Sequence, residues 1–257
     1  MRSFTYFTKN IFSRLISPKQ IVVFGYSWQY FTRNDYLCVQ KVNMPLSLKN
    51  KFDGIIFDLD GTLWDSTGNV AKAWQEAIEQ VDYVDEVMTR EKIRSITGLA
   101  YNVIFDTLFP HLNGEKRTEL MGICAKSELA YLHKEGGELY PSLDATLDYL
   151  ARKYRLFIVS NCQSGYIEVF LKLSGTMHYF SGHQCYGTKG NPKAENIKDI
   201  VHDHQLEAPV YVGDTMGDYN SATKAGVPFI FADYGFGKVE HGQIATISTF
   251  SDLVELL

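Results

Sequence analysis

The chain has 257 residues, of which 45% are hydrophobic and 21% charged, a composition typical of a folded globular protein rather than of a disordered or coiled-coil chain. No stretch approaches the ~18 consecutive apolar residues of a membrane-spanning helix, so we expect no membrane association. The net charge is −5, but the first 43 residues carry +5 and the remainder −10. Since an acidic body repels polyanions, we expect no nucleic acid partner.

The four cysteines, Cys38, Cys124, Cys162 and Cys185, are far apart and form no C-x-x-C pair. This spacing predicts neither a disulfide framework nor a zinc site, and a reducing cytosol is the compartment we expect.

Residues 1–43 are basic and aromatic without clear periodicity, and only Ile21 to Phe24 resembles a strand. Three interpretations are open: an extension upstream of a natural start at Met44, a targeting segment, and an accessory segment of the fold. We favour the first and expect residues 1–48 to lie outside the fold.

From Phe52 onward, strand patterns alternate with helical ones. Short apolar runs, as expected of strands buried on both faces, occur at 54–58, 156–159, 210–212, 228–231 and 245–247. Apolar residues at helical spacing follow Pro141 and Pro192, each a favourable residue for a first turn. The alternation predicts an α/β fold with a doubly wound, Rossmann-like parallel sheet.

About 90 residues separate the first run from the second, which is too long for a single crossover, and this stretch has helical patterning throughout. One predicted helical face consists of Leu120, Ile123, Ser127 and Tyr131. We therefore predict an all-helical domain at 67–137, inserted into a core domain formed by 49–66 and 138–257.

Polar residues gather where the predicted strands end. In a parallel sheet these ends share one edge, which brings together eight side chains: Asp58, Asp60, Thr62, Ser160, Asn161, Lys193, Asp214 and Asp218. Two carboxylates ~4 Å apart repel by about 4 kcal/mol at an effective dielectric of ~20, so the cluster requires a cation. Oxygen ligands without Cys or His suit Mg²⁺, and the hydroxyl and ammonium groups suit the oxygens of a phosphate. The sequence therefore predicts a phosphoryl-transfer site.

Four motifs in this order resemble those of the haloacid dehalogenase-like hydrolase superfamily. The D-x-D-G-T motif stands at 58–62 and the G-D-x-x-x-D motif at 213–218, with Ser160 and Lys193 as the second and third motifs between them. Lys189 is an alternative for the third motif, but the helix start that follows Lys193 favours Lys193. The resemblance covers nearly all of 52–257.

The resemblance implies a role for each of these residues. Asp58 is the expected nucleophile, which forms an aspartyl-phosphate, and Asp60 is the expected acid and base. The expected Mg²⁺ ligands are Asp58, the backbone carbonyl of Asp60, and Asp214. Asp218 is expected to support these ligands without contacting the ion. Phosphate is expected to bind Ser160, Asn161 and Lys193, together with Thr62.

The subclass follows from the residues at two places. Asp60 is a carboxylic acid, as in the phosphatases of the superfamily, whereas dehalogenation needs no proton donor there. The loop at 97–102 has neither the lysine of the phosphonate-cleaving branch nor the arginine usual in sugar-phosphate mutases. We expect a phosphoglycolate phosphatase-like enzyme, a monomer or homodimer, that acts on a small phosphorylated metabolite while the helical cap excludes water. A mutase of the same fold and a non-catalytic protein that binds a phosphorylated ligand are the alternatives.

Overall fold

The computed structural model describes residues 5–7, 19–23, 26–33, 36–42 and 48–257. The first four ranges are strands β1 (Thr5–Phe7), β2 (Lys19–Val23), β3 (Tyr26–Arg33) and β4 (Tyr36–Val42), which pair antiparallel in the order β1-β4-β3-β2. The strand-like residues 21–23 lie in β2, whereas Phe24 and the expected start at Met44 lie outside the described residues. These strands form a sheet separate from the six-stranded one. The independence of this segment from the fold stays a prediction.

A six-stranded sheet forms the centre of residues 49–257, and every neighbouring pair of its strands is parallel. In spatial order the strands are β12 (Ala245–Ile247), β11 (Phe229–Ala232), β10 (Pro209–Gly213), β5 (Gly54–Phe57), β8 (Arg155–Ser160) and β9 (Phe180–Cys185). The predicted doubly wound α/β fold and its five strands are confirmed. The sixth strand, β9, was missed because it is a partly exposed edge strand without an apolar run.

Both faces of the sheet are buried, as the continuous apolar runs predicted. Ile56, Phe157 and Tyr211 pack on one face with Ile197 and Ala222 of the helices, and the alternate strand residues are equally buried on the other face. The helices of this domain are α5 (Leu143–Ala151), α6 (Tyr166–Ser174), α7 (Tyr186–Lys189), α8 (Lys193–Asp203), α9 (Met216–Ala225) and α10 (Asp252–Leu256), with a 3₁₀ turn, η1 (Met177–Tyr179).

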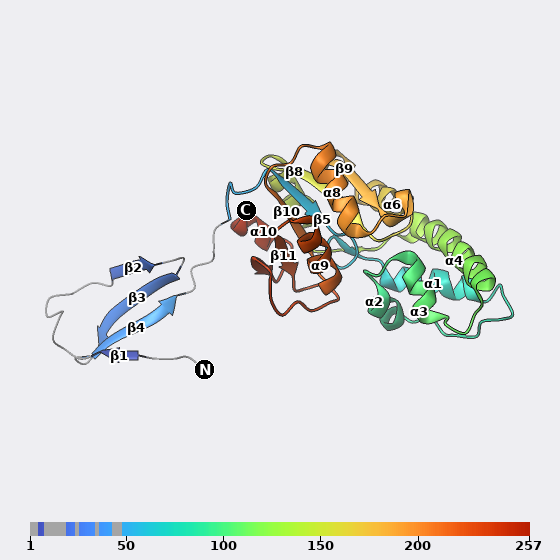
Figure 1. The fold of residues 1–257 in the computed structure, drawn as a ribbon, viewed down its shortest axis with the longest axis horizontal. Helices are drawn as coiled ribbons and strands as arrows, with labels where there is room; N and C mark the ends of the chain where they lie inside the picture. Colours follow the sequence, from blue (N-terminus) through green and yellow to red (C-terminus); the bar gives the residue numbers. More distant parts are fainter. Residues whose placement is uncertain (1–4, 8–18, 24–25, 34–35, 43–47) are drawn as a thin grey trace. The chain divides into compact units, whose positions relative to one another are not determined.

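Four helices lie between the short strands β6 (Trp64–Asp65) and β7 (Glu138–Leu139), which pair antiparallel where the chain leaves and rejoins the sheet domain. They are α1 (Thr67–Ile78), α2 (Arg90–Ile96), α3 (Tyr101–Leu108) and α4 (Gly114–Glu135). Figure 1 shows them gathered at one end of the six-stranded sheet.

The predicted face of α4 is confirmed at Leu120 and wrong at its other three residues. Its buried side chains are Leu120, Cys124, Glu128 and Leu132, whereas Ile123, Ser127 and Tyr131 are only partly buried. The two faces are adjacent on the helix, and the difference is that the buried one includes a carboxylate. Sequence patterning assigns such a residue to the surface because charged side chains are rarely buried without partners.

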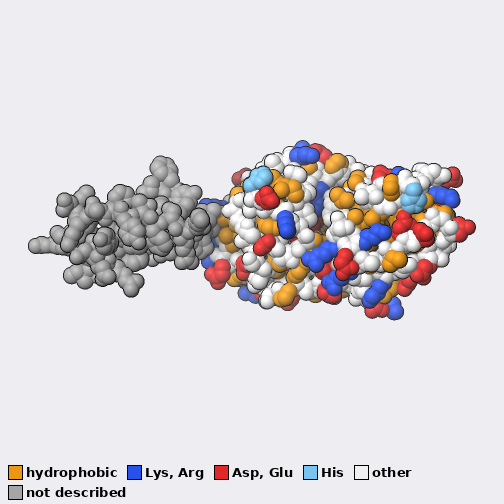
Figure 2. All heavy atoms as spheres, turned by 90° about the horizontal axis from the view of Figure 1, so that it is seen from below, with side chains coloured by type: hydrophobic (Ala, Val, Ile, Leu, Met, Phe, Trp, Pro, Cys, Tyr) orange, Lys and Arg blue, Asp and Glu red, His pale blue; other side chains and the backbone are white. Residues whose placement is uncertain are grey.

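On the face drawn in Figure 2, acidic and basic side chains are interspersed over the described surface. None of the described helices is both long and apolar enough to cross a membrane. Among the described side chains, Cys124, Cys162 and Cys185 are free thiols.

Candidate active site

Three neighbouring strands deliver the predicted residues to one edge of the sheet. Phe57 of β5 lies in register with Val212 of β10 on one side and with Ile158 of β8 on the other. The chain therefore leaves these strands at nearly the same level, and Asp58, Ser160 and Asp214 follow there. All three side chains are buried, as is that of Lys193, the first residue of α8.

Three carboxylates form a tight cluster at this edge. One oxygen from each of Asp58, Asp214 and Asp218 lies within 4.8 Å of the others. The Lys193 ammonium donates to Asp58 Oδ1 at 2.8 Å and to Asp218 Oδ1 at 2.6 Å. Three acids thus share a single buried lysine, and this excess of negative charge on oxygen ligands fits a divalent cation.

The pKa values of the cluster reflect first the burial of its groups and then this excess of negative charge. Burial raises the pKa of Asp58 to about 7, with a further rise from Asp218 that Lys193 partly offsets. Burial, then Asp218 and Asp58, raise the pKa of Asp214 well above its usual range. Burial lowers the pKa of Lys193, but Asp218 and Asp58 outweigh it and hold that pKa well above its ordinary value. Each shift indicates a site that needs additional positive charge when its acids are ionised.

Local hydrogen bonds at the start of α9 fix the position of Asp218, the second aspartate of the G-D-x-x-x-D motif. Asp218 Oδ2 accepts hydrogen bonds from the backbone and hydroxyl of Thr215, and its own N–H donates to Thr215 Oγ1, which makes a capping box at the start of α9. The other oxygen, Oδ1, accepts from Lys193. Asp218 therefore lies inside the carboxylate cluster with Asp58 and Asp214.

Gly61 permits the close approach of the first and last motifs. Its φ of +87° is in the left-handed region, and a Cβ there would lie 2.2 Å from Asp214 Oδ2. Neither the backbone conformation nor the space allows another residue. Asp214 also accepts from the Phe236 N–H at 2.7 Å and from Thr62 Oγ1 at 3.4 Å.

Asp60 lies in a different environment from Asp58. One of its oxygens accepts hydrogen bonds from Ser66 Oγ at 2.8 Å and from the Tyr166 hydroxyl at 2.9 Å. Burial raises its pKa to about 6, although these two donors oppose the rise. Two carboxyl groups on one loop therefore occupy distinct sites, one beside Lys193 and one beside hydroxyl groups. Sequence patterning missed Ser66 and Tyr166, which belong to no motif.

The remaining predicted residues are in the same region with different partners. Ser160 lines the cavity described below, and the Asn161 side-chain amide donates to the Gly98 carbonyl at 2.7 Å. That bond links the end of β8 to the loop between α2 and α3. The alternative lysine, Lys189, pairs with Asp199 at the surface, so Lys193 is the lysine at the strand ends.

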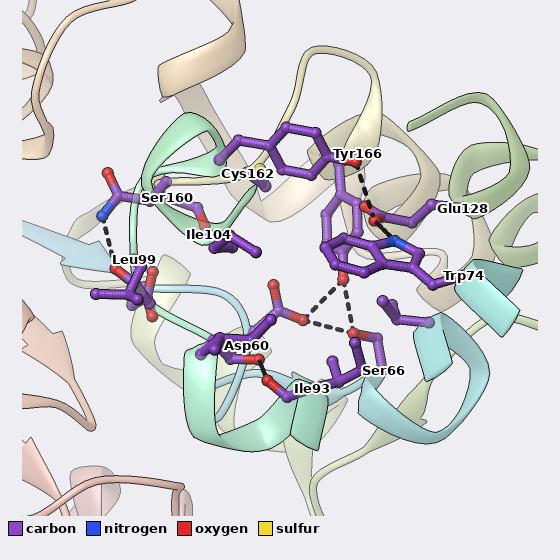
Figure 3. Close-up of a pocket in the computed structure, with 17 residues that line it drawn as sticks. Asp60, Ser66, Trp74, Ile93, Leu99, Ile104, Glu128, Ser160, Cys162 and Tyr166 are labelled. Atoms are coloured by element: carbon purple, nitrogen blue, oxygen red, sulfur yellow. Dashed lines mark hydrogen bonds between the residues drawn. The ribbon is translucent and has the colours of Figure 1, made fainter. Parts of the chain in front are cut away.

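A cavity adjoins this edge and separates it from the inserted helices (Figure 3). Asp58, Asp60, Ser160 and Asn161 line it from the sheet domain. The helical side contributes mainly apolar and aromatic residues, with one carboxylate: Val70, Trp74, Ile93, Ile96, Tyr101, Ile104 and Glu128. The arrangement brings Asp58 and Asp60, two carboxyl groups with different partners, to the wall of one cavity.

The comparison with known families decides the class of protein. Residues 55–232 match the family described as haloacid dehalogenase-like hydrolase. The chain belongs to this family. As a haloacid dehalogenase-like hydrolase it is an enzyme, and the resemblance carried by the four motifs is confirmed.

Relatives of this haloacid dehalogenase-like hydrolase cover most of its length. The phosphoglycolate phosphatase of Vibrio cholerae is 30% identical over 203 residues, which is 74% of this chain and 86% of the relative. That of Aquifex aeolicus is 29% identical over 215 residues, or 79% and 95% of the two chains. A haloacid dehalogenase-like family hydrolase from Streptococcus pneumoniae shares the fold with a TM-score of 0.69 at 23% identity, over 80% of this chain and 98% of that one.

Proposed function

We propose that this hydrolase is a phosphatase that cleaves a small phosphomonoester through an aspartyl-phosphate on Asp58. The observation that carries the proposal is the pair Asp58 and Asp60, two carboxyl groups on one loop with different partners. Acid–base assignments follow from such differences in environment. The names of the Vibrio and Aquifex relatives support phosphate ester hydrolysis as the reaction.

In the first half-reaction an oxygen of Asp58 attacks phosphorus, and the bond from phosphorus to the ester oxygen breaks. Asp60, in its protonated form, gives its proton to the departing alkoxide. In the second half-reaction a water molecule attacks phosphorus and Asp60 takes its proton, which releases inorganic phosphate and restores the Asp58 carboxylate.

The remaining residues bind and orient the substrate. Ser160 and Lys193 are proposed to donate hydrogen bonds to phosphate oxygens; in support, Ser160 lines the same cavity as Asp58 and Lys193 is bonded to Asp58. Thr62 and Asn161 are proposed for the same role once their present partners exchange for phosphate. Lys193 also holds Asp58 Oδ1 in position for attack.

The proposed metal is Mg²⁺, held by Asp58, Asp214 and the backbone carbonyl of Asp60, with Asp218 alongside. The all-oxygen donor set and the shortage of positive charge in the carboxylate cluster support this choice. When bound, such an ion supplies positive charge to the phosphate oxygens during transfer.

We also propose that residues 67–137 act as a cap over the core formed by 49–66 and 138–257. The hydrogen bonds that join them near the site include those from Asn161 to the Gly98 carbonyl, from Arg94 to the Gly235 carbonyl at 3.0 Å, and from Gln163 to Glu128. Closure of the helices over the strand ends would exclude bulk water from the reacting phosphate.

The decisive experiment measures phosphate release from a panel of phosphate esters with Mg²⁺ and with a chelator. We expect release that depends on Mg²⁺ in the wild type and is abolished by Asp58→Asn. Substantial turnover by the variant would exclude the covalent mechanism. Relocation of phosphate on a hexose phosphate without release would instead indicate the mutase.

A further inference from the structure

Glu128 is a buried carboxylate in the cavity wall that none of the four motifs includes. It lies on α4 with only 3% of its surface exposed and lines the same cavity as Asp58 and Asp60. Figure 3 shows Glu128 together with Trp74 on the side of the cavity opposite Ser160 and Leu99. Glu128 therefore shares the wall of this cavity with Asp58, the residue proposed to receive the phosphate.

Three neutral donors hold this carboxylate in place. Trp74 Nε1 donates to Oε2 at 2.6 Å, the Tyr101 hydroxyl donates to Oε2 at 3.5 Å, and Gln163 Nε2 donates to Oε1 at 2.9 Å. A carboxylate offers about four acceptor positions, so Oε1 retains one for a further donor. No arginine, lysine or histidine of the described chain is within salt-bridge distance of Glu128.

The rest of the cavity wall does not supply the missing positive charge. The described residues that line it include three carboxylates, Asp58, Asp60 and Glu128, but no lysine, arginine or histidine. The other side chains are apolar, aromatic, amide, thiol or hydroxyl groups. A negatively charged alcohol part would meet repulsion here without a compensating cation, whereas a positively charged one would supply the partner that Glu128 lacks.

The structure assigns Glu128 as a specificity-determining residue: we propose that it favours phosphate esters of short amino alcohols and disfavours those whose alcohol part carries a carboxylate. This inference rests on the proposed phosphatase function and specifies its substrate class. The bound ammonium group would donate to Glu128 Oε1, while the phosphate lies at Asp58.

The ionisation of Glu128 accords with this assignment. Burial raises its pKa to about 7, against the lowering effect of the Gln163 and Trp74 hydrogen bonds. A cation beside it stabilises the ionised form and lowers that pKa again. Binding of an ammonium ester should therefore tighten as the pH rises through 7, relative to an uncharged ester of the same size.

Phosphoglycolate, the compound in the names of the Vibrio and Aquifex relatives, carries a carboxylate on its alcohol part. The inference therefore distinguishes this chain from those relatives by substrate preference, within the same reaction.

The test measures kcat/KM with Mg²⁺ at about pH 8 for three short esters that differ in charge: O-phosphoethanolamine, ethylene glycol monophosphate and phosphoglycolate. The enzymes are the full-length wild type, Glu128→Gln, and Glu119→Gln as a control on the exposed side of α4. A charge ~5 Å away at an effective dielectric of ~20 changes an equilibrium by about a hundredfold. We expect the wild type to prefer the amine over the carboxylate ester by at least that factor. Glu128→Gln should lower the ratio by more than a hundredfold, because it removes both the attraction for the amine and the repulsion of the carboxylate, and Glu119→Gln should leave it unchanged.

p-Nitrophenyl phosphate separates this inference from the proposed function. If neither it nor any of the three esters is hydrolysed, the proposed function fails and the inference with it. If p-nitrophenyl phosphate is hydrolysed but phosphoglycolate is preferred, or if Glu128→Gln leaves the ratio unchanged, the inference alone is overturned. Where a short ester is not turned over, its inhibition constant against p-nitrophenyl phosphate replaces kcat/KM. Should Glu128→Gln fail to fold, the order of preference in the wild type decides.

Discussion

Replacement of Lys193 by methionine tests how the carboxylate cluster is stabilised. Lys193 is 3% exposed and is the cation bonded to both Asp58 and Asp218. Methionine has a similar length and suits a buried position, so the substitution removes the charge and little volume. The metal-free variant then contains three buried carboxylates without a lysine among them.

The magnitude follows from the burial of the pair. Removal of one partner of a buried ion pair costs about 3–5 kcal/mol, because the other charge is left uncompensated. For a domain of this size about 1 kcal/mol moves the melting temperature by roughly 2–4 °C. We therefore expect the melting temperature of Lys193→Met to fall by about 10 °C in a chelator. Mg²⁺ at about 100 times its dissociation constant should raise the free energy of unfolding by about 2.7 kcal/mol.

The loss of stability caused by Lys193→Met should also depend on pH. Burial raises the pKa of Asp58 to about 7, so acidification neutralises this carboxylate in the folded protein before it does so in the unfolded chain. The loss of stability caused by Lys193→Met should therefore be largest above pH 7 and shrink toward pH 5.

Thermal denaturation of wild type and variant, with Mg²⁺ and with a chelator at two pH values, measures these effects. Lys198→Met is the matched control, since Lys198 lies on the same helix, is 48% exposed and pairs with Glu195 at the surface. Its melting temperature should change by no more than about 2 °C. If wild type and Lys193→Met have the same melting temperature in a chelator, Lys193 does not compensate the negative charge of the carboxylate cluster.

Three further predictions concern the reaction and the extent of the fold. Asp58→Asn should abolish turnover yet raise the melting temperature of the metal-free protein above pH 7, because it removes a buried charge; a lower melting temperature would contradict this. Asp60→Asn should slow both half-reactions, by about 10²–10⁴-fold, and any aspartyl-phosphate formed should persist in rapid-quench experiments; a burst followed by normal turnover would assign the proton transfers elsewhere. A chain that begins at Met44 should match the melting temperature and activity of the full chain, and a drop of several degrees would show that the preceding strands stabilise the hydrolase domain.

The position of the candidate site was predictable from the sequence because its residues are placed by local rules. Asp58, Ser160 and Asp214 each follow an apolar run, and a parallel sheet brings such strand ends to one edge. The edge strand β9 was not predictable in this way, since its residues are only partly buried and show no apolar run. Its place is set by pairing with β8.

The sequence alone was therefore sufficient to predict the five apolar strands of the sheet, the edge where the motifs meet and the family. The tertiary structure alone decided which groups surround Asp60 and which face of α4 is buried. Ser66 and Tyr166 are 100 residues apart yet both donate to Asp60. Glu128 is buried because Trp74 and Gln163, from other elements of the chain, satisfy its oxygens. Burial of a carboxylate depends on donors that only the folded chain brings together, so helical periodicity along α4 could not reveal it.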